Sequence, residues 1–412
     1  MKTLKKKFIL CIFFCLFFNL TAVYAADDSH EIDLNAIVDA NSFKYPKDVN
    51  LYPLIDGNNV KNVILLIGDG MGPGIIASAR AKAASPGGLL YMERFPVIGI
   101  QKNYSANALI TDSAAAATAL AAGRKTNNQM VGITPDGTKL KTILEAARDN
   151  GFKTGLVVTS TITHATPACF ASHISNRDDE PEIAGQLIAN KVNVLFGGGR
   201  QFFLPKNAPG SKRPDNKNLI KQAEDLGYLY IQDANGLKFA KGKYILGLFQ
   251  LKHLTTQQPE PSLAELTGKA IEVLNEPEKE SFVDRDKGFF LMVEGSQIDF
   301  AAHLDNLNHT IRQTLLFDRA VKMAVDFALK DKHTLVIVTA DHDTGGLTIT
   351  GGDLTGKHLK VKWTSLDHTG LPIIVYAFGP AAQTFSGTYD NTDIPKKIAY
   401  LLGIKNFPQN EK

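Results

Sequence analysis

The sequence predicts an α/β fold in which a large, mostly parallel central sheet carries helices on both faces. Short continuous runs of Val, Ile and Leu recur along the chain, as expected for strands that are covered on both faces. Stretches with helical periodicity lie between these runs. Strands that alternate with helices favour a parallel sheet, so the two patterns together predict this fold class.

The individual elements follow from these patterns. Continuous apolar runs predict strands at 62–68, 153–159, 192–196, 288–293, 333–340 and 372–378. Helical periodicity predicts helices at 114–122, 140–150, 183–189, 262–274, 310–329 and 394–402. Residues 26–58 are polar and turn-rich and predict an N-terminal arm. Clusters of Gly, Pro, Asn and Lys over 200–260 predict a surface excursion, with a position over the functional site left open.

The first 25 residues have the features of a secretory signal peptide. Four lysines precede a nearly unbroken apolar run over 8–20, and small residues around Ala25 suit cleavage by signal peptidase. The run is shorter than the ~20 residues that a membrane span needs. Neither Cys11 nor Cys15 lies in a convincing lipobox, which argues against a lipoprotein. The sequence predicts a periplasmic or secreted protein without a stable membrane anchor, folded as one domain over 26–412.

Export changes the charge and the cysteine count of the mature chain. The signal peptide contains four of the 45 Lys and Arg residues and none of the 42 Asp and Glu residues, which leaves a net charge of −1. This balance gives no support for a partner such as nucleic acid or an anionic membrane. Cys169 is the one cysteine outside the signal peptide, so the mature chain cannot form an intrachain disulfide.

Acidic and imidazole side chains follow four of the predicted strands, where open α/β sheets place their functional sites. These side chains are Asp69, Glu294, Asp341 with His342, and His164. Four strands that end in this way predict a metal site. A dinucleotide-binding loop at 68–74 is rejected, because its glycine spacing does not match the G-x-G-x-x-G pattern and its carboxylate would repel a pyrophosphate.

Asp299 and His303 are predicted to share a metal ion. Their i, i+4 spacing places both on one face of a helix, and a carboxylate and an imidazole are suitable zinc ligands. Such pairs are often solvated surface residues, but this pair begins five residues after Glu294. A zinc site needs a further protein ligand, and His368, just before a predicted strand, is a candidate.

Ser113 is the candidate nucleophile. It precedes the alanine-rich run 114–122, so its plain structural interpretation is a helix N-cap. A helix N-terminus also favours negative charge, which suits an alkoxide or a phosphate. Serine needs an activating base or metal, and because a G-x-S-x-G motif is absent, we favour a metal. A lone arginine such as Arg177 is usually a surface residue. Near a phosphate, however, it would act as a bidentate clamp.

Together these motifs closely resemble those of the alkaline phosphatase family. The matching segments are 63–72, 111–123, 164–177, 293–303, 339–342 and 367–370. They occur in the family's order and span most of the mature chain. The resemblance implies the alkaline phosphatase fold, hydrolysis of phosphate monoesters and a homodimer.

The resemblance also implies residue roles. It implies three metal sites with these ligands: Asp299, His303 and His368 for one zinc; Asp69, Asp341 and His342 for a second zinc; Asp69, Thr166 and Glu294 for magnesium. Ser113 would become phosphorylated, Arg177 would clamp the phosphate and Asp112 would hold Arg177 in position.

Two positions at the substrate site depart from the best-known bacterial pattern of the family. His164 stands where that pattern has Asp, and Phe300 stands where it has Lys. An imidazole at the first position favours zinc over magnesium in the third metal site. Phe300 removes a cation near the phosphate, which predicts weaker product binding and an altered pH dependence. The short segment 342–368 predicts that the crown-like insertion of larger relatives is minimal.

Three functions compete. Ser113 and Arg177 favour a phosphate monoesterase, because a dianionic terminal phosphate suits a guanidinium clamp. The alternative is a phosphodiesterase or sulfatase of the same superfamily, but a diesterase is expected to hold its second ester group in an apolar pocket, which the sequence does not locate. A non-enzymatic phosphate-scavenging or structural metal protein would require a damaged site, and no matched ligand is missing.

Overall fold

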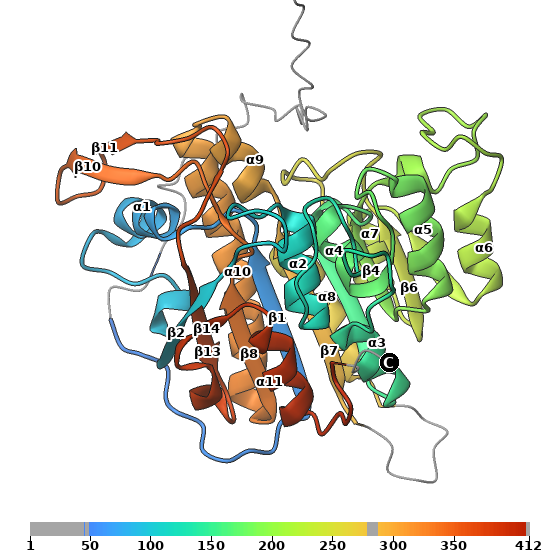
Figure 1. Cartoon of the computed structure of the whole chain (residues 1–412), viewed down its shortest axis with the longest axis horizontal. Coiled ribbons are helices and arrows are strands. Elements are labelled where there is room, and N and C mark those ends of the chain that lie inside the picture. Colours follow the sequence, from blue (N-terminus) through green and yellow to red (C-terminus); the bar gives the residue numbers. More distant parts are fainter. Residues whose placement is uncertain (1–44, 46–48, 278–286, 409–412) are drawn as a thin grey trace, which may run out of the picture. The chain divides into compact units, whose positions relative to one another are not determined.

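The computed structural model describes residues 45, 49–277 and 287–408, so the predicted signal peptide lies outside the described residues. A ten-stranded sheet runs through this part of the chain (Figure 1). Its strands are, in spatial order, β14 (Gly387–Asp390), β2 (Val97–Lys102), β13 (Ile373–Phe378), β8 (Thr334–Thr339), β1 (Asn62–Gly68), β7 (Phe289–Gly295), β3 (Lys153–Thr161), β4 (Val194–Gly198), β6 (Tyr244–Leu248) and β5 (Tyr228–Ile231).

Strand direction brings the functional residues to one edge of this sheet. β13 is antiparallel to both of its neighbours, β8 and β2, whereas the other strand pairs are parallel. The carboxyl ends of the parallel strands and the amino end of β13 therefore lie at the same edge. The predicted fold class, a mostly parallel sheet with helices on both faces, is confirmed.

Side chains of the central strand β1 pack into two hydrophobic cores, one on each face of the sheet. Val63, Leu65 and Ile67 pack into one core, and Ile64 and Leu66 pack into the other. The first core is covered by α2 (Ser113–Ala122), α3 (Ile143–Asp149), α4 (Ala165–Ala171), α5 (Glu180–Ala189), α6 (Leu219–Asp225) and α11 (Asp393–Leu401). The second is covered by α1 (Pro73–Ala84), α7 (Ala234–Phe239), α8 (Leu263–Asn275), α9 (Gln297–His303) and α10 (Leu307–Asp331).

The sequence-based predictions succeed where an element is continuously apolar. β1 has the predicted bounds, because all seven of its residues are buried. β2 was not predicted, because buried and exposed residues alternate along it. The prediction that 200–260 is only a surface excursion was wrong, since this segment contains β5 and β6. β6 is largely buried and pairs with β4, but it is short, contains Gly247 and lies among polar residues.

Two short antiparallel strand pairs lie in the segment between β8 and β13. An exposed hairpin, β10 (Thr348–Gly352) with β11 (Leu359–Lys362), lies between His342 and His368. In the same segment, β9 (Asp343–Thr344) pairs with β12 (His368–Thr369). Between β9 and β12 the segment forms this hairpin, where the sequence predicted a minimal insertion. Within the described ranges, no helix is long and apolar enough to cross a membrane.

Candidate active site

Ser113 is the first residue of α2, and its side chain is not used for capping. The N-cap is Asp112, whose Oδ1 accepts a hydrogen bond of 2.8 Å from the Ala115 backbone N–H. The plain structural interpretation of Ser113 as the cap was therefore wrong by one residue. The Ser113 hydroxyl is buried, and its Oγ lies 3.2 Å from Nε2 of His342. The alanine-rich helix thus presents a hydroxyl at its positive end.

His342 lies between two carboxylates beside Ser113. Its Nε2 is 3.2 Å from Oδ2 of Asp341 and 3.5 Å from Oδ1 of Asp69, and all three side chains are fully buried. The other oxygen of Asp341 accepts hydrogen bonds from the backbone N–H groups of Gly70 and His342. Gly70 has φ +67°, and a Cβ there would lie 2.8 Å from Oδ1 of Asp299. The turn after β1 therefore has to be glycine for these groups to approach.

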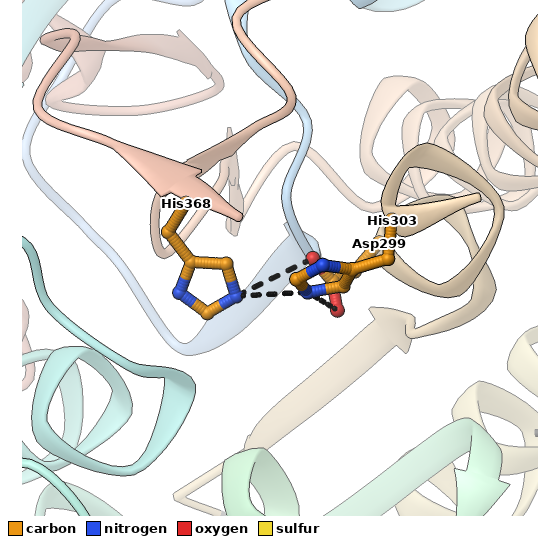
Figure 2. A group of neighbouring side chains, drawn as sticks. All are labelled: Asp299, His303 and His368. Carbon is orange, nitrogen blue, oxygen red and sulfur yellow. Dashed lines mark hydrogen bonds and ion pairs between the residues drawn. The ribbon is translucent and has the colours of Figure 1, made fainter. Parts of the chain in front are cut away.

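Asp299, His303 and His368 converge from two parts of the chain (Figure 2). Nε2 of His303 lies 3.4 Å from Oδ2 of Asp299, and Nε2 of His368 lies 3.7 Å from Oδ1. The two Nε2 atoms are 3.2 Å apart. Figure 2 shows the α9 pair facing the imidazole of His368, which precedes the reversed strand β13.

The hydrogen bonds of the two Nδ1 atoms determine which ring nitrogen carries the proton in His303 and His368. Nδ1 of His303 donates to the backbone oxygen of Leu366 over 2.7 Å, and Nδ1 of His368 donates to that of Thr111 over 2.9 Å. Because a carbonyl only accepts, neutral rings carry lone pairs on their Nε2 atoms. Two lone pairs and a carboxylate that point at one place suit a zinc ion. Without a cation, burial lowers the pKa of His303, but Asp299 outweighs this effect and raises it to about 9.

A third group consists of Asp69, Glu294 and His164, with one ligand atom from each within 4.8 Å of the others. Both carboxylates are fully buried, and burial raises the pKa of Glu294 to about 8. The pKa of Asp69 is also raised, by burial and by neighbouring carboxylates. Among the predicted metal ligands that the structure describes, several buried oxygens lack a hydrogen-bond partner: both of Asp69, both of Glu294, Oδ2 of Asp341 and Oγ1 of Thr166.

The donor set fits metal cations. Buried carboxylates are unfavourable unless they are neutralised or coordinate a metal, and here several lie together. Two further groups of potential ligands occur in the described residues: Asp299, His303 and His368, and Asp69, Asp299 and His342. The second group contains Asp299 where the sequence predicted Asp341, although Asp341 adjoins the same imidazole. The structure therefore brings all the predicted ligands to one edge of the sheet.

Arg177 is held by two predicted site residues. Its Nη1 donates to Oδ2 of Asp112 over 3.5 Å, and its Nη2 donates to Nε2 of His164 over 3.1 Å. Oδ2 of Asp112 also accepts from the backbone N–H of Gln129 over 2.8 Å. Asp112 thus caps the helix that carries Ser113 and holds the guanidinium on the same side, which agrees with its predicted positioning role.

Phe300 lies against His164, and both contact a residue that sequence reasoning missed. The rings of His164 and Phe300 are 5.7 Å apart, and the ring of His253 lies 5.1 Å from that of Phe300. His253 lies in the irregular segment after β6, where no motif marks it. Thr344 was also missed; its hydroxyl contacts Oδ1 of Asp299 and Nδ1 of His342. Its position two residues after His342 in an extended segment could have indicated it.

The chain is similar to known phosphatases in sequence and structure. A family model described as alkaline phosphatase matches residues 60–359 and 355–404. Alkaline phosphatase 3 of Bacillus subtilis (strain 168) is 34% identical, over 86% of this chain and 91% of that protein. The solved alkaline phosphatase of the Antarctic bacterium TAB5 is 33% identical, with a TM-score of 0.74 over 84% of this chain and 99% of that chain. A variant of that enzyme with one histidine replaced by aspartate, at 33% identity and a TM-score of 0.73 over the same shares of both chains, has Mg bound in its M3 site.

Proposed function

Because this chain belongs to the alkaline phosphatase family, we propose that it hydrolyses phosphate monoesters through a phosphoserine intermediate on Ser113. One observation carries this proposal: the buried Oγ of Ser113 lies at a helix N-terminus, 3.2 Å from an imidazole within the group of potential metal ligands. This position combines a nucleophile with the positive electrostatics that a phosphate requires.

The residues would hold two zinc ions and one further divalent cation. Asp299, His303 and His368 would hold one zinc, and Asp69, Asp341 and His342 the other. Asp69, Thr166 and Glu294 would hold magnesium, with zinc favoured if His164 joins the site. The TAB5 variant, in which aspartate replaces a histidine, has Mg bound in its M3 site, which supports a third divalent-cation site here. When bound, these cations would lower the pKa of the Ser113 hydroxyl and stabilise the negative charge of the reacting oxygens.

The protein side chains would position the phosphoryl group for two successive displacements. The Ser113 oxygen attacks phosphorus in line with the departing alkoxide, so that an Oγ–P bond forms as the ester P–O bond breaks. A water then attacks the phosphoserine, which releases inorganic phosphate and restores the hydroxyl. Arg177 would bind two non-bridging oxygens through its remaining donors, while Asp112 keeps the guanidinium oriented.

Phe300 and His164, whose rings lie 5.7 Å apart, would form one side of the phosphate site. Phe300 brings no charge to this side, so phosphate binding would depend more heavily on Arg177. This arrangement favours release of the product over its retention. His164 would contribute through its contact with Arg177, whose Nη2 lies 3.1 Å from the ring.

We also propose that the chain acts outside the cytoplasm and forms a homodimer. The N-terminal pattern of lysines, an apolar run and small residues supports removal of residues 1–25 and a periplasmic or secreted location. The homodimer rests on the family relationship alone.

The function is tested by comparing three substrates with one chromophore: p-nitrophenyl phosphate, bis-p-nitrophenyl phosphate and p-nitrophenyl sulfate. Each is assayed at alkaline pH before chelation, after chelation and after zinc and magnesium are restored. We expect the monoester to be the best substrate, with activity that is lost and regained with the metals. Faster turnover of the diester or the sulfate would support the alternative activity on the same fold. No turnover with any of them would support the non-enzymatic alternative.

A further inference from the structure

The ring of His253 completes a cluster of three rings at the phosphate side of the site. It lies 6.3 Å from the ring of His164 at an interplanar angle of 87° and 5.1 Å from that of Phe300 at 68°. His164 and Phe300 are themselves 5.7 Å apart at 79°. All three contacts have the edge-to-face geometry that rings prefer. Each ring therefore restricts the rotation of the other two.

Hydrogen bonds connect the loop that contains His253 to two elements of the candidate site, β3 and α9. The backbone N–H of Leu254 donates to the oxygen of Thr159 in β3 over 3.0 Å. Nε2 of Gln297, in α9, donates to the oxygen of Leu254 over 2.5 Å. His253 is thus tied to the strand that leads to His164 and to the helix that contains Phe300.

Arg312 of α10 secures the far end of this loop. Its two terminal nitrogens donate to the hydroxyl and the backbone oxygen of Thr256, over 2.8 and 2.7 Å. Thr256 has φ +58°, which is unfavourable for a β-branched residue. Such a conformation persists only where surrounding contacts impose it, and here they hold the backbone that presents His253.

A hydrogen bond also fixes the orientation of the His253 ring. The backbone N–H of Thr161 donates to its Nδ1 over 3.0 Å. Nδ1 therefore acts as an acceptor, and a neutral ring carries its proton on Nε2. Asparagine can reproduce this acceptor without the ring, and phenylalanine can reproduce the ring without the acceptor. The two properties of His253 can therefore be tested separately.

We propose that His253 is a positioning residue, which orients His164 and Phe300 and, through the His164–Arg177 hydrogen bond, prepares the guanidinium for phosphate. This inference rests on the proposed function of the site. His253 acts by restricting ring motion and takes no part in bond formation. Its loss should therefore weaken binding of phosphate and substrate more than it slows turnover.

The test compares His253→Ala, His253→Asn and His253→Phe by KM, kcat and the dissociation constant of inorganic phosphate measured by calorimetry. We expect Ala and Asn to raise both KM and the phosphate dissociation constant about three- to tenfold, with kcat within about twofold. Phe should restore most of the affinity because it keeps the ring. His333→Ala is the matched control, since His333 precedes β8 and lies at the opposite edge of the sheet.

Combination with Arg177→Ala separates positioning from general loosening of the fold. If His253 acts through Arg177, the effect of His253→Ala on phosphate binding should disappear in the Arg177→Ala background. An effect of the same size in both backgrounds would overturn the proposal, as would near-native affinity in His253→Asn with lost affinity in His253→Phe. A native protein without monoesterase activity would instead contradict the proposed function, whereas an active enzyme insensitive to His253→Ala would overturn only the role of His253.

Discussion

Arg177 donates a hydrogen bond to His164, with Nη2 of the guanidinium 3.1 Å from Nε2 of the imidazole. A guanidinium has no acceptor, so the imidazole supplies its lone pair. A neutral imidazole has only one such lone pair on its ring nitrogens. His164 therefore cannot accept this hydrogen bond and ligate a cation beside Asp69 and Glu294 at the same time.

Arg177→Ala is expected to raise the zinc affinity of the third site about tenfold. It frees the lone pair of His164 from a charged hydrogen bond worth about 1.5–3 kcal/mol, and a tenfold change corresponds to about 1.4 kcal/mol. Zinc titration against a chromophoric chelator measures the change. The control combines Arg177→Ala with His164→Ala. If Arg177→Ala raises zinc affinity equally in that background, the gain comes from loss of positive charge alone, which would contradict competition for the His164 lone pair.

Ser113→Ala should lower kcat for p-nitrophenyl phosphate by roughly three orders of magnitude or more, because it removes the proposed nucleophile. The fold should be preserved, since Asp112 rather than Ser113 caps the helix. Steady-state kinetics and circular dichroism measure the two effects. Ser386→Ala, at a 3₁₀ turn away from the site, serves as the control and should leave kcat unchanged. Full activity in Ser113→Ala would exclude the phosphoserine mechanism.

Asp112→Asn should separate the two functions of this side chain. Asparagine is an effective N-cap, so the melting temperature should change little. The lost charge should weaken orientation of Arg177 and raise the phosphate inhibition constant severalfold. Asp112→Ala should add a loss of about 1 kcal/mol in the free energy of unfolding, because the cap is removed as well. An Asn variant with native phosphate inhibition would show that the ion pair with Arg177 is dispensable.

Glu145 should make folding stability sensitive to acid. Burial alone would raise its pKa, but hydrogen bonds and charge from His173, with hydrogen bonds from Thr142 and Asn190, lower it from 4.5 to about 2. The folded-state pKa is below the unfolded value, so the stabilisation is present above about pH 4.5 and is lost as pH falls towards 2. The shift corresponds to roughly 3 kcal/mol. Urea unfolding at pH 3 and pH 7 should show a smaller difference for Glu145→Gln than for the native chain.

Chelation should lower the melting temperature as well as the activity. The buried carboxylates of Asp69, Glu294 and Asp341 would lose the cations that we propose to neutralise them. Ligand binding to the folded state stabilises by about 4 kcal/mol when free ligand exceeds Kd about 1,000-fold. Calorimetry with EDTA, with zinc-saturated EDTA as the control, measures the effect. An unchanged melting temperature after elemental analysis confirms metal loss would contradict a stabilising metal set.

Local sequence patterns were sufficient to select many of the residues that the structure brings together in the candidate site. Asp69 and Glu294 were identifiable because each adjoins a buried strand, and parallel pairing brings strand ends together. Asp299 and His303 were visible as an i, i+4 pair. The half-exposed strand β2 was missed because its apolar residues alternate with exposed ones.

His253 could not be found from its neighbours in the sequence. Its proximity to His164 depends on the pairing of β6 with β4 and on the tertiary contacts that fasten the loop after β6. The hydrogen bond between Arg177 and His164 depends likewise on two segments meeting in space. Local periodicity carries no information about such meetings, so these relationships required the structure.

The reversed direction of β13 makes the segment between His342 and His368 a closed excursion. His342 follows the carboxyl end of β8, and His368 precedes the amino end of β13. Because these two strands are antiparallel, both ends lie at the same edge of the sheet, and the chain between them leaves and returns there. Lengthening such an excursion costs only about 0.6 kcal/mol of closure entropy for each doubling of its length. The β10–β11 hairpin is therefore a point at which this fold can accept inserted residues without displacing the sheet or the predicted metal-ligating residues.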